Sequence, residues 1–310
     1  MTDRPTPADG AAAGPFDRRA VARHRDRAAR RAEPTDFLHR EVAARLAARL
    51  DDIDRRFPLA LDIGSGTGAV ARAVGNRKGI ARIVQCDLSE SMARRAGGPA
   101  VVADEEALPF AGGRFDLVLS GLALHWTNDL PGALAQIRAA LKPDGLFLAA
   151  LLGGDTLREL REALLEAEIA ETGGAGPRTS PAVDLRDAGA LLQRAGFALP
   201  VADRDRITVT YRDAFALMRD LRHMGESNAL SLRQRHFTRR AVLMRAAALY
   251  AARFAGEDGR IPATFEVIFL TGWAPHDAQP RPLAPGSARH SLADALGGRE
   301  VDPEAGPDTP

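Results

Sequence analysis

The stretch LDIGSGTG, residues 61–68, is the most informative part of the sequence. A short apolar run typical of a buried strand leads into it from Leu59, and the helix-compatible sequence AVARAV follows at once. Glycines directly after a strand let a ligand approach the backbone where a side chain would obstruct it. The stretch therefore predicts a first strand, a ligand-binding turn and a helix, in that order.

Strand-like and helix-like segments alternate along the rest of the chain. The further strand-like runs are 82–86, 100–103, 115–119, 146–152, 207–211 and 265–271. Helical patterns cover 35–50, 156–172, a segment that ends at Ala195, and an insertion from Asp213 to Phe254. This alternation predicts an α/β, Rossmann-like fold: a mostly parallel seven-stranded sheet with helices on both faces and a helical insertion before the last strand.

Composition changes divide the chain into four expected parts. We expect a disordered tail at 1–15, a helical arm at 16–57, a main domain at 58–274 with its insertion at 213–255, and a Pro/Gly-rich tail at 275–310. The arm sequence FDRRAVARHRDRAARR carries seven arginines against two aspartates. It is interpreted either as a solvated helix face, which is the usual role of such a run, or as a basic arm for a partner. Its aspartates argue against an organellar targeting segment.

The charge balance and cysteine content exclude several classes of protein. The 42 basic and 41 acidic residues leave a net charge of +1, so no overall field recruits nucleic acid. The single cysteine, Cys86, excludes an internal disulfide framework and a cysteine-built zinc site. No apolar run is long enough to cross a bilayer. We therefore expect a cytoplasmic protein without a transmembrane segment.

A carboxylate at the end of the second strand indicates the ligand. Asp87 follows the glycine turn by about twenty residues, where a carboxylate can accept both hydroxyls of a ribose. Together they predict a nucleoside-containing cofactor, either a dinucleotide or S-adenosylmethionine. The glycine spacing lacks the third-glycine offset of the pyrophosphate fingerprint. Asp62, one residue before the end of the first strand, suits a ligand with an ammonium group and opposes a pyrophosphate, so S-adenosylmethionine is favoured.

The successive motifs resemble those of a known superfamily. LDIGSGTG, CDLSESM, ADEEALPF, FDLVLSGLALHW and LKPDGLFL are similar to the signature motifs of class I S-adenosylmethionine-dependent methyltransferases. LHWTNDLPGAL, GGDTLREL, SPAVDLRDAGALLQRAGF, DLRHMGESNAL, EDGRIPATFEVIFLTGW and RPLAPGSARHSL resemble the methyltransferase-like assembly factors of respiratory complex I. These factors are relatives of the biotin-pathway malonyl-carrier-protein methyltransferase. The resemblance runs from about Phe16 to Leu292.

The resemblance also implies roles for individual residues. Asp62, Gly64, Gly66 and Gly68 would hold the methionine end of the cofactor, Asp87 and Leu88 the ribose and one adenine face, and Asp104 with Glu105 the adenine edge. The spacing alone supports a role in cofactor binding only for the three glycines and Asp87.

Several functions are compatible with this resemblance. It implies a methyltransferase that modifies a protein substrate during complex I assembly, with a peripheral-arm subunit as partner and the inner face of the respiratory membrane as its place. The alternatives are an arginine hydroxylase of such a subunit, a carboxyl methyltransferase on a carrier-bound acyl group, and a non-catalytic cofactor-binding chaperone. The Asn/Asp-Pro-Pro-aromatic motif of nucleic-acid amino methylation is absent from the sequence, which argues against a nucleic-acid substrate. The sequence does not predict an oligomeric state.

The loop from Ser120 to Trp126 follows the fourth strand, where ligands lie in this fold class. His125 is its one imidazole and is interpreted either as a general base or as a packed, hydrogen-bonded side chain. Trp126 either covers the cofactor or belongs to the core.

The segment HMGESNAL, residues 223–230, is interpreted either as a cap over the substrate opening or as a turn between helices with its break at Gly225. His223 and Glu226 have a spacing seen in metal sites, but one pair lacks a third ligand. His39-Arg40-Glu41 forms an HxE pattern and is expected on a helix surface. We therefore predict no metal site.

Overall fold

The computed structural model describes residues 14–31, 35–280, 287 and 297. The chain divides into two units, 1–275 and 276–310, and the sheet with its helices belongs to the first.

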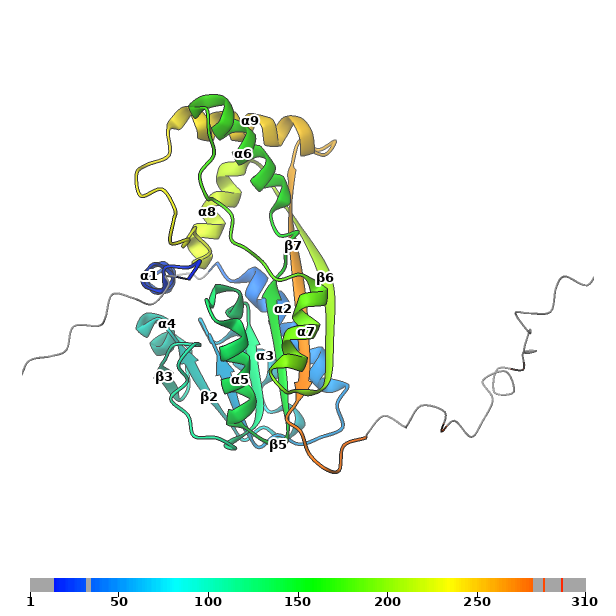
Figure 1. Cartoon of the computed structure of the whole chain (residues 1–310). Helices are drawn as coiled ribbons and strands as arrows, with labels where there is room; N and C mark the ends of the chain where they lie inside the picture. The colour runs from blue at the N-terminus through cyan, green and yellow to red at the C-terminus, as the bar shows by residue number, and fades with distance from the viewer. Residues whose placement is uncertain (1–13, 32–34, 281–286, 288–296, 298–310) are drawn as a thin grey trace, which may run out of the picture. The chain divides into compact units, whose positions relative to one another are not determined.

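Seven strands form one sheet in the order β3-β2-β1-β4-β5-β7-β6 (Figure 1). They are β1 (Leu59–Ile63), β2 (Arg82–Asp87), β3 (Ala100–Val102), β4 (Phe115–Gly121), β5 (Leu141–Leu152), β6 (Ala198–Tyr211) and β7 (Ile261–Trp273). The pairs among β1 to β5 are parallel, whereas β7 is antiparallel to both of its neighbours. The predicted fold class is confirmed.

Helices cover both faces of this sheet. They are α1 (Arg18–Ala29), α2 (Phe37–Asp51), α3 (Ala69–Val74), α4 (Glu90–Arg95), α5 (Leu130–Ala140), α6 (Arg158–Thr172), α7 (Leu185–Arg194), α8 (Ala214–Met224) and α9 (Arg240–Phe254), with short 3₁₀ turns η1 (Arg77–Gly79) and η2 (Leu124–Trp126). Within β4, Leu117 and Leu119 join one hydrophobic cluster, which includes α2 and α3, and Val118 joins the opposite one, which includes α5 and α7. The period of two along a strand buried on both faces produces these two cores.

The last three strands are longer than the sequence pattern predicts. β6 begins at Ala198, although only 207–211 reads as a strand in the sequence. The part of β6 before Ile207 includes Asp203 and Asp205, and such charges are typical of an edge strand, which β6 is. Arg45 of α2 bonds Asp205 at 3.0 Å and Arg49 bonds Asp203, so these charges are matched from a neighbouring helix. A local hydrophobicity pattern contains no information about such ion pairs between segments that are distant in the sequence.

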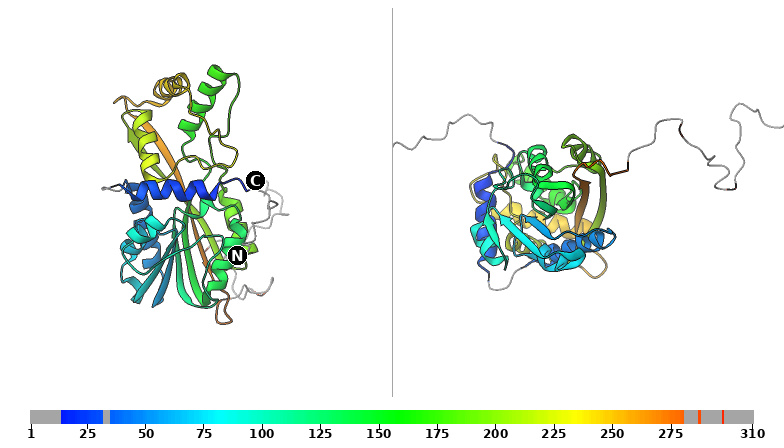
Figure 2. Two further views of the ribbon diagram at one scale, coloured as in Figure 1. Left: turned by 90° about the vertical axis from the view of Figure 1, so that its left-hand side faces the viewer. Right: turned by 90° about the horizontal axis from the view of Figure 1, so that it is seen from below.

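α1 lies between the sheet layer and the helices of the insertion, as Figure 2 shows. It contacts α4 on one side and α8 on the other. α8 and α9 lie between β6 and β7 in the chain, and α9 packs against α6. The carboxyl end of β2 meets α1, where Arg25 Nη1 lies 3.4 Å from Asp87 Oδ1. In the part of the chain that the structure describes, no helix is long and apolar enough to span a membrane.

Candidate functional site

The glycine turn after β1 has the backbone that only glycine adopts readily. Gly64, Gly66 and Gly68 have φ values of 66°, 52° and 80°. A Cβ on Gly64 would meet the Cβ of Ala123 at 2.0 Å, and one on Gly68 would meet the carbonyl oxygen of Ala96 at 2.4 Å. A Cβ on Gly66 would have no atom within 4 Å. Gly64 and Gly68 thus permit close packing, whereas Gly66 presents bare backbone to open space.

Asp87 connects the end of β2 to this turn. Its Oδ2 accepts a hydrogen bond from the amide of Gly66 at 2.9 Å, and its Oδ1 accepts one from the amide of Ser89 at 2.8 Å. The side chain is fully buried, and burial raises the pKa of Asp87. The structure therefore brings Gly66 and Asp87 into direct contact, as the spacing of the two motifs requires.

Asp62 is a buried carboxyl group that has no hydrogen-bond partner among the described residues. Neither of its oxygens has a donor in good hydrogen-bond geometry among the described residues. Burial, assisted by the charge of Asp87, raises the pKa of Asp62 to about 8, and the backbone of Ala71 opposes this only weakly. Buried polar groups are rarely left unpaired, so an orphaned carboxyl beside a glycine turn indicates a missing cationic partner. This observation fits the ammonium group of S-adenosylmethionine.

Two arginines of α1 reach the acidic residues of the predicted cofactor site. Arg25 Nη1 donates to Glu105 Oε1 at 2.7 Å and lies 3.4 Å from Asp87 Oδ1. Arg18 Nη2 bonds Asp104 Oδ1 at 2.6 Å and also bonds Glu105. Arg25 is only 8% exposed. The interpretation of the arm as a solvated helix face is therefore wrong for these two residues, although Arg19 and Arg23 are exposed.

The charge of Arg25 offsets several acidic residues at once. Burial lowers its pKa, but the carboxylates of Asp87, Glu105 and Glu226 outweigh burial and raise the pKa of Arg25 well above its ordinary value. In turn, burial opposes the ionisation of Glu105, while Arg25 and Arg18 bring the net pKa of Glu105 below its usual range. The sequence shows the arginines and the acids but not their pairing, because more than sixty positions separate them along the chain.

α1 is fixed by contacts at its beginning. The ring of Phe16 packs edge-on against Trp126, with ring centres 5.2 Å apart. The amide of Asp17 donates to the carbonyl of Ala229 at 2.8 Å, and its side chain pairs with Arg233 at 2.9 Å. Leu88 packs against the same small cluster, which joins Phe16 and Trp126 to residues 229–230. Trp126 is thus a core residue that also anchors α1.

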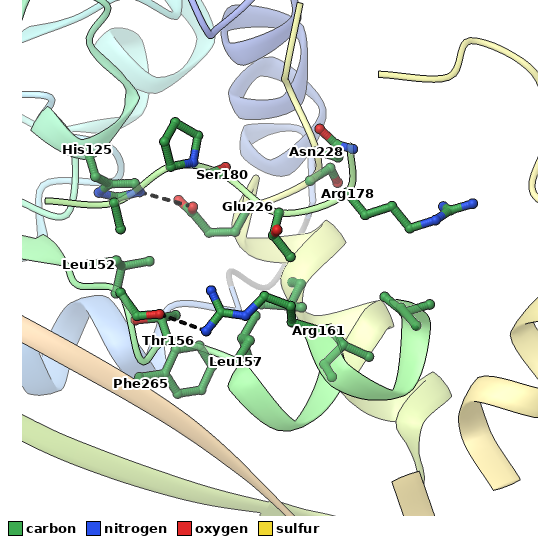
Figure 3. A pocket seen from close by; sticks show the side chains of 18 of the residues that line it. His125, Leu152, Thr156, Leu157, Arg161, Arg178, Ser180, Glu226, Asn228 and Phe265 are labelled. Carbon is green, nitrogen blue, oxygen red and sulfur yellow. Dashed lines mark hydrogen bonds and ion pairs between the residues drawn. The ribbon is translucent and has the colours of Figure 1, made fainter. Parts of the chain in front are cut away.

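A cavity of about 530 Å³ opens beside this cluster (Figure 3). Its walls come from η2, the end of β5, α6, residues 178–182, α8, and residues 226–228. His125 and Trp126 line it on the side of the sheet. Gly225, with a φ of 92°, ends α8, and the residues that follow it form the wall. Residues 223–230 therefore combine the helix-ending turn with a lining of the cavity.

Glu226 is the central charged group of this cavity. Its Oε2 lies 3.3 Å from Nε2 of His125 and accepts a hydrogen bond from Trp126 Nε1 at 3.1 Å. Burial opposes ionisation, but the hydrogen bond from His125 and the charges of His125, His39 and Arg25 hold the pKa of Glu226 below its usual range. Its other oxygen, Oε1, has no hydrogen bond from the described residues. Glu226 therefore presents a negative charge with one oxygen available.

His39, expected on a helix surface, is half-buried and lies within the electrostatic influence of Glu226. Its Nδ1 is buried without a hydrogen-bond partner, and burial lowers the pKa of His39 although Glu226 and Asp36 act in the opposite direction. The surface prediction is wrong because His39 shares a helix face with the buried Val42, Ala43 and Leu46. That helical spacing was the available signal. Among the residues that the structure describes, no group of three or more His, Cys, Asp or Glu could hold a metal ion.

Comparisons with known proteins show the family of this chain. The model of the methyltransferase domain family matches residues 61–149. The human mitochondrial arginine-hydroxylase NDUFAF5 is 44% identical over 286 residues, which cover 90% of this chain and 82% of that protein. The malonyl-[acyl-carrier protein] O-methyltransferase of Laribacter hongkongensis is 40% identical over 281 residues, which cover 86% of this chain and 92% of that enzyme.

A solved structure supports the fold. The Bacillus halodurans protein BH2331, described as a methyltransferase, superposes with a TM-score of 0.52 at 18% identity. The superposition covers 76% of this chain and all of that one.

The fold and the strand-end site together define an S-adenosylmethionine-binding enzyme of the class I methyltransferase fold. Within that class, the chain belongs to the family that contains the NDUFAF5 arginine hydroxylases and the related malonyl-[acyl-carrier protein] O-methyltransferases. The predicted resemblance is thereby confirmed.

Proposed function

We propose that this enzyme binds S-adenosylmethionine at the ends of β1 and β2 and modifies an arginine side chain of a protein partner during complex I assembly. The observation that carries the proposal is the ionised, partly unpaired Glu226 in the cavity beside the cofactor site. The arginine-hydroxylase relatives, which cover most of the chain, support the choice of acceptor. The proposal places the enzyme in the cytoplasm, peripheral to the inner face of the respiratory membrane.

For the cofactor, we assign the methionine end to Asp62 and the glycine turn at Gly64, Gly66 and Gly68. Asp87 would accept the ribose hydroxyls, and Leu88 would lie against one face of the adenine. Asp104 and Glu105 would bind the adenine edge, which requires the guanidinium groups of α1 to share or release these carboxylates. When bound, this cofactor supplies an electrophilic methyl group on a positively charged sulfur.

For the acceptor, Glu226 offers the partner that a guanidinium prefers. A guanidinium presents several N–H donors in a plane, and its bonds to a carboxylate are strong where water is excluded. Apolar side chains of Leu157, Met218 and Phe265 line the same cavity and would hold the aliphatic part of the arginine. His125 holds the Glu226 carboxylate in place, so we assign it a positioning role in preference to that of a general base.

The decisive experiment is peptide mass spectrometry of the complex I peripheral-arm subunits from cells with and without the gene. We expect one arginine to lose the mass of an oxygen atom in the deletion strain. That reaction consumes molecular oxygen and a two-electron donor as co-substrates, since the cofactor supplies neither. Loss of a methylene-sized increment from an arginine would instead show methyl transfer to the same acceptor. Identical arginine peptides in both strains would refute arginine modification.

A second candidate function rests on Arg161. This half-buried residue of α6 lines the cavity, and its Nη2 donates to the carbonyl of Gly154 at 2.8 Å. No carboxylate of the described residues lies within ion-pair distance of it, whereas the nearby Arg178 is paired with Glu168 at 2.7 Å. A free guanidinium suits the carboxylate of a carrier-bound acyl group, which is the acceptor class named for the O-methyltransferase relatives.

Radiolabelled S-adenosylmethionine tests this second candidate. Transfer of label to malonyl-acyl carrier protein, with loss of transfer in Arg161→Gln and retention in the matched surface variant Arg194→Gln, would support it. Absence of transfer by the wild-type enzyme, when the same preparation binds the cofactor, would exclude it.

A further inference from the structure

Two large apolar side chains project into solvent from one short loop. The loop, residues 231–239, connects the cavity-lining segment to α9. Leu232 is 84% exposed and Phe237 is 99% exposed, more than any other large apolar residue in the part of the chain that the structure describes. Single exposed apolar residues are common on protein surfaces. A protruding aromatic ring beside a second exposed apolar side chain is instead typical of an interaction surface.

The loop and the sequence around it carry positively charged but no negatively charged side chains. From Ser227 to Gly256 the sequence contains six arginines and no aspartate or glutamate. Arg235, Arg239 and Arg240 are exposed and form no ion pair with the residues described. Arg240 is the first residue of α9, whereas the third arginine of the loop itself, Arg233, pairs with Asp17 of the α1 cap. Three unpaired positive charges around Phe237 are complementary to an acidic surface.

The base of the loop is tied to the rest of the protein. The amide of Ser231 donates to the carbonyl of Pro15 and its hydroxyl donates to the carbonyl of Gly14, both at 2.8 Å. At the other end, Thr238 accepts a hydrogen bond from Arg178 at 3.0 Å. The apolar side chains are therefore presented from a segment that is anchored near both of its ends.

The position of the loop connects it to the cavity. Thr238 lines the cavity together with Ser227, Asn228 and Arg178, so one end of the loop forms part of the wall. Asn228 donates to the carbonyl of Pro177 at 2.9 Å and joins that wall to residues 178–182. A macromolecule that rests on Phe237 and the arginines would therefore lie beside the opening and could extend one side chain toward Glu226.

We propose that the loop 231–239 is the docking element for the protein partner, and that the partner is an acidic segment with an apolar socket that presents its arginine to the cavity. This inference rests on the proposed function and specifies its substrate: the modified arginine belongs to a protein surface rich in Asp and Glu. An anionic membrane and RNA are the competing occupants, because both also attract arginines with exposed apolar or aromatic side chains. The cavity wall favours a protein, since a side chain has to enter beside the loop.

The test compares variants in the deletion strain. Phe237→Ser and the charge reversal of Arg235, Arg239 and Arg240 to Glu are each introduced on the full-length chain. The matched controls are Val201→Ser on β6 and Arg194→Glu on α7, which are also exposed. We expect both loop variants to reduce the modified fraction of the target arginine by about tenfold, as the loss of an interface anchor does. S-adenosylmethionine affinity and melting temperature should stay at the wild-type values, as should all properties of the controls.

The outcomes separate the two proposals. If the wild-type chain modifies no arginine, the proposed function fails. If the wild-type chain modifies an arginine and the loop variants do so equally well, the docking proposal fails while the function stands. Sedimentation with phosphatidylglycerol vesicles and gel shift with a single-stranded RNA 20-mer are measured in parallel at physiological salt. Binding of either probe that the loop variants abolish would reassign the loop to that partner and overturn the proposal.

A photo-crosslinking amino acid at Phe237 identifies the docked surface. We expect a crosslink to the same protein that carries the modified arginine, within a peptide rich in Asp and Glu. A crosslink to that protein at a basic or neutral surface would contradict the predicted complementarity.

Discussion

Arg25 lies among the carboxylates that the proposed cofactor site requires. In the structure it offsets the negative charge of Asp87, Glu105 and Glu226. A buried ion pair is not necessarily stabilising in itself, but removing one member leaves the other charges buried and unpaired. Arg25 therefore has a stabilising role that its place in an arginine-rich arm does not reveal.

The variant Arg25→Met tests that role. It keeps the aliphatic bulk and removes the charge, so we expect the free energy of unfolding in urea to fall by about 3 kcal/mol. Arg23→Met is the control, because the Arg23 side chain is exposed and its 3.9 Å pair with Asp17 is weak. Equal stability of the two variants would show that Arg25 does not neutralise the buried acids.

The raised pKa of Asp62 predicts a pH dependence of cofactor binding. With a pKa of about 8, the group is mostly protonated at pH 6 and mostly ionised at pH 9. An ammonium ligand binds the ionised form, so the dissociation constant for S-adenosylmethionine should fall by about fiftyfold between pH 6 and pH 8, with the steeper part below pH 7. Calorimetry in buffers of different ionisation enthalpy should also detect proton release near pH 7.

Asp62→Asn provides the control for this prediction. It should bind the cofactor more weakly at pH 8 and lose most of the pH dependence. A wild-type dissociation constant that does not change from pH 6 to pH 8 would disprove the assignment of Asp62 to the ammonium group.

Glu226→Gln separates acceptor binding from cofactor binding. The amide keeps the size of the side chain and removes its charge, so a guanidinium loses its partner. We expect arginine modification in cells to decrease at least about a hundredfold, since a buried charged pair is lost, while calorimetric affinity for S-adenosylmethionine stays the same. Glu162→Gln on the exposed side of α6 is the matched control. Normal modification by Glu226→Gln would contradict the acceptor assignment.

Some of these residues were predictable and others were not. The glycine turn and Asp87 follow from sequence spacing, because one strand, one helix and the next strand fix the distance between them. His39 and Arg25 were missed because their burial depends on how α1 and α2 pack over the ends of the strands. His39 had a local signal in its helical spacing from Val42 and Leu46, whereas Arg25 had none.

At the scale of elements, α1 depends on its cap. The side chain of Asp17 accepts a hydrogen bond from the amide of Ala20 at 3.0 Å and pairs with Arg233 of the docking loop. Asp17→Ala removes both interactions and should cost about 1–2 kcal/mol of local stability. Hydrogen exchange should then become faster in α1 while β1 stays protected.

Asp184→Ala is the matched control, because Asp184 caps α7 in the same way, with a 2.8 Å bond from Asp187. It should accelerate exchange in α7 only. Unchanged exchange in α1 of the Asp17 variant would mean that Phe16 and the buried arginines hold the helix without the cap.

The elements themselves were predicted unevenly. β1 and β4 are buried on both faces and contain mainly apolar residues, so the sequence indicates them directly. The part of β6 before Ile207 was not predicted, because alternating charged residues at a sheet edge resemble the sequence of a loop. Long-range pairing with β7 decides its structure, and a local pattern contains no information about that partner.

At the scale of the whole molecule, the enzyme has two adjoining candidate sites. Asp62, the glycine turn and Asp87 form a strand-end region that fits a nucleoside cofactor, and our proposal assigns the acceptor to the cavity that Glu226 lines. Arg25 lies within the electrostatic influence of both regions. The family resemblance predicted the strand-end region. The cavity was not predicted, because its walls come from η2, α6 and the segment after α8, which are separate in the sequence.

The central claim is that Asp87 holds the cofactor in this fold, and calorimetric titration of S-adenosylmethionine into the wild-type protein and Asp87→Ala tests it most directly. We predict saturable binding to the wild type and an affinity about ten- to a hundredfold lower in the variant, because a buried acceptor for two hydroxyls is lost. Circular dichroism establishes that the variant is folded. Equal affinity of the folded variant and the wild type would contradict the account.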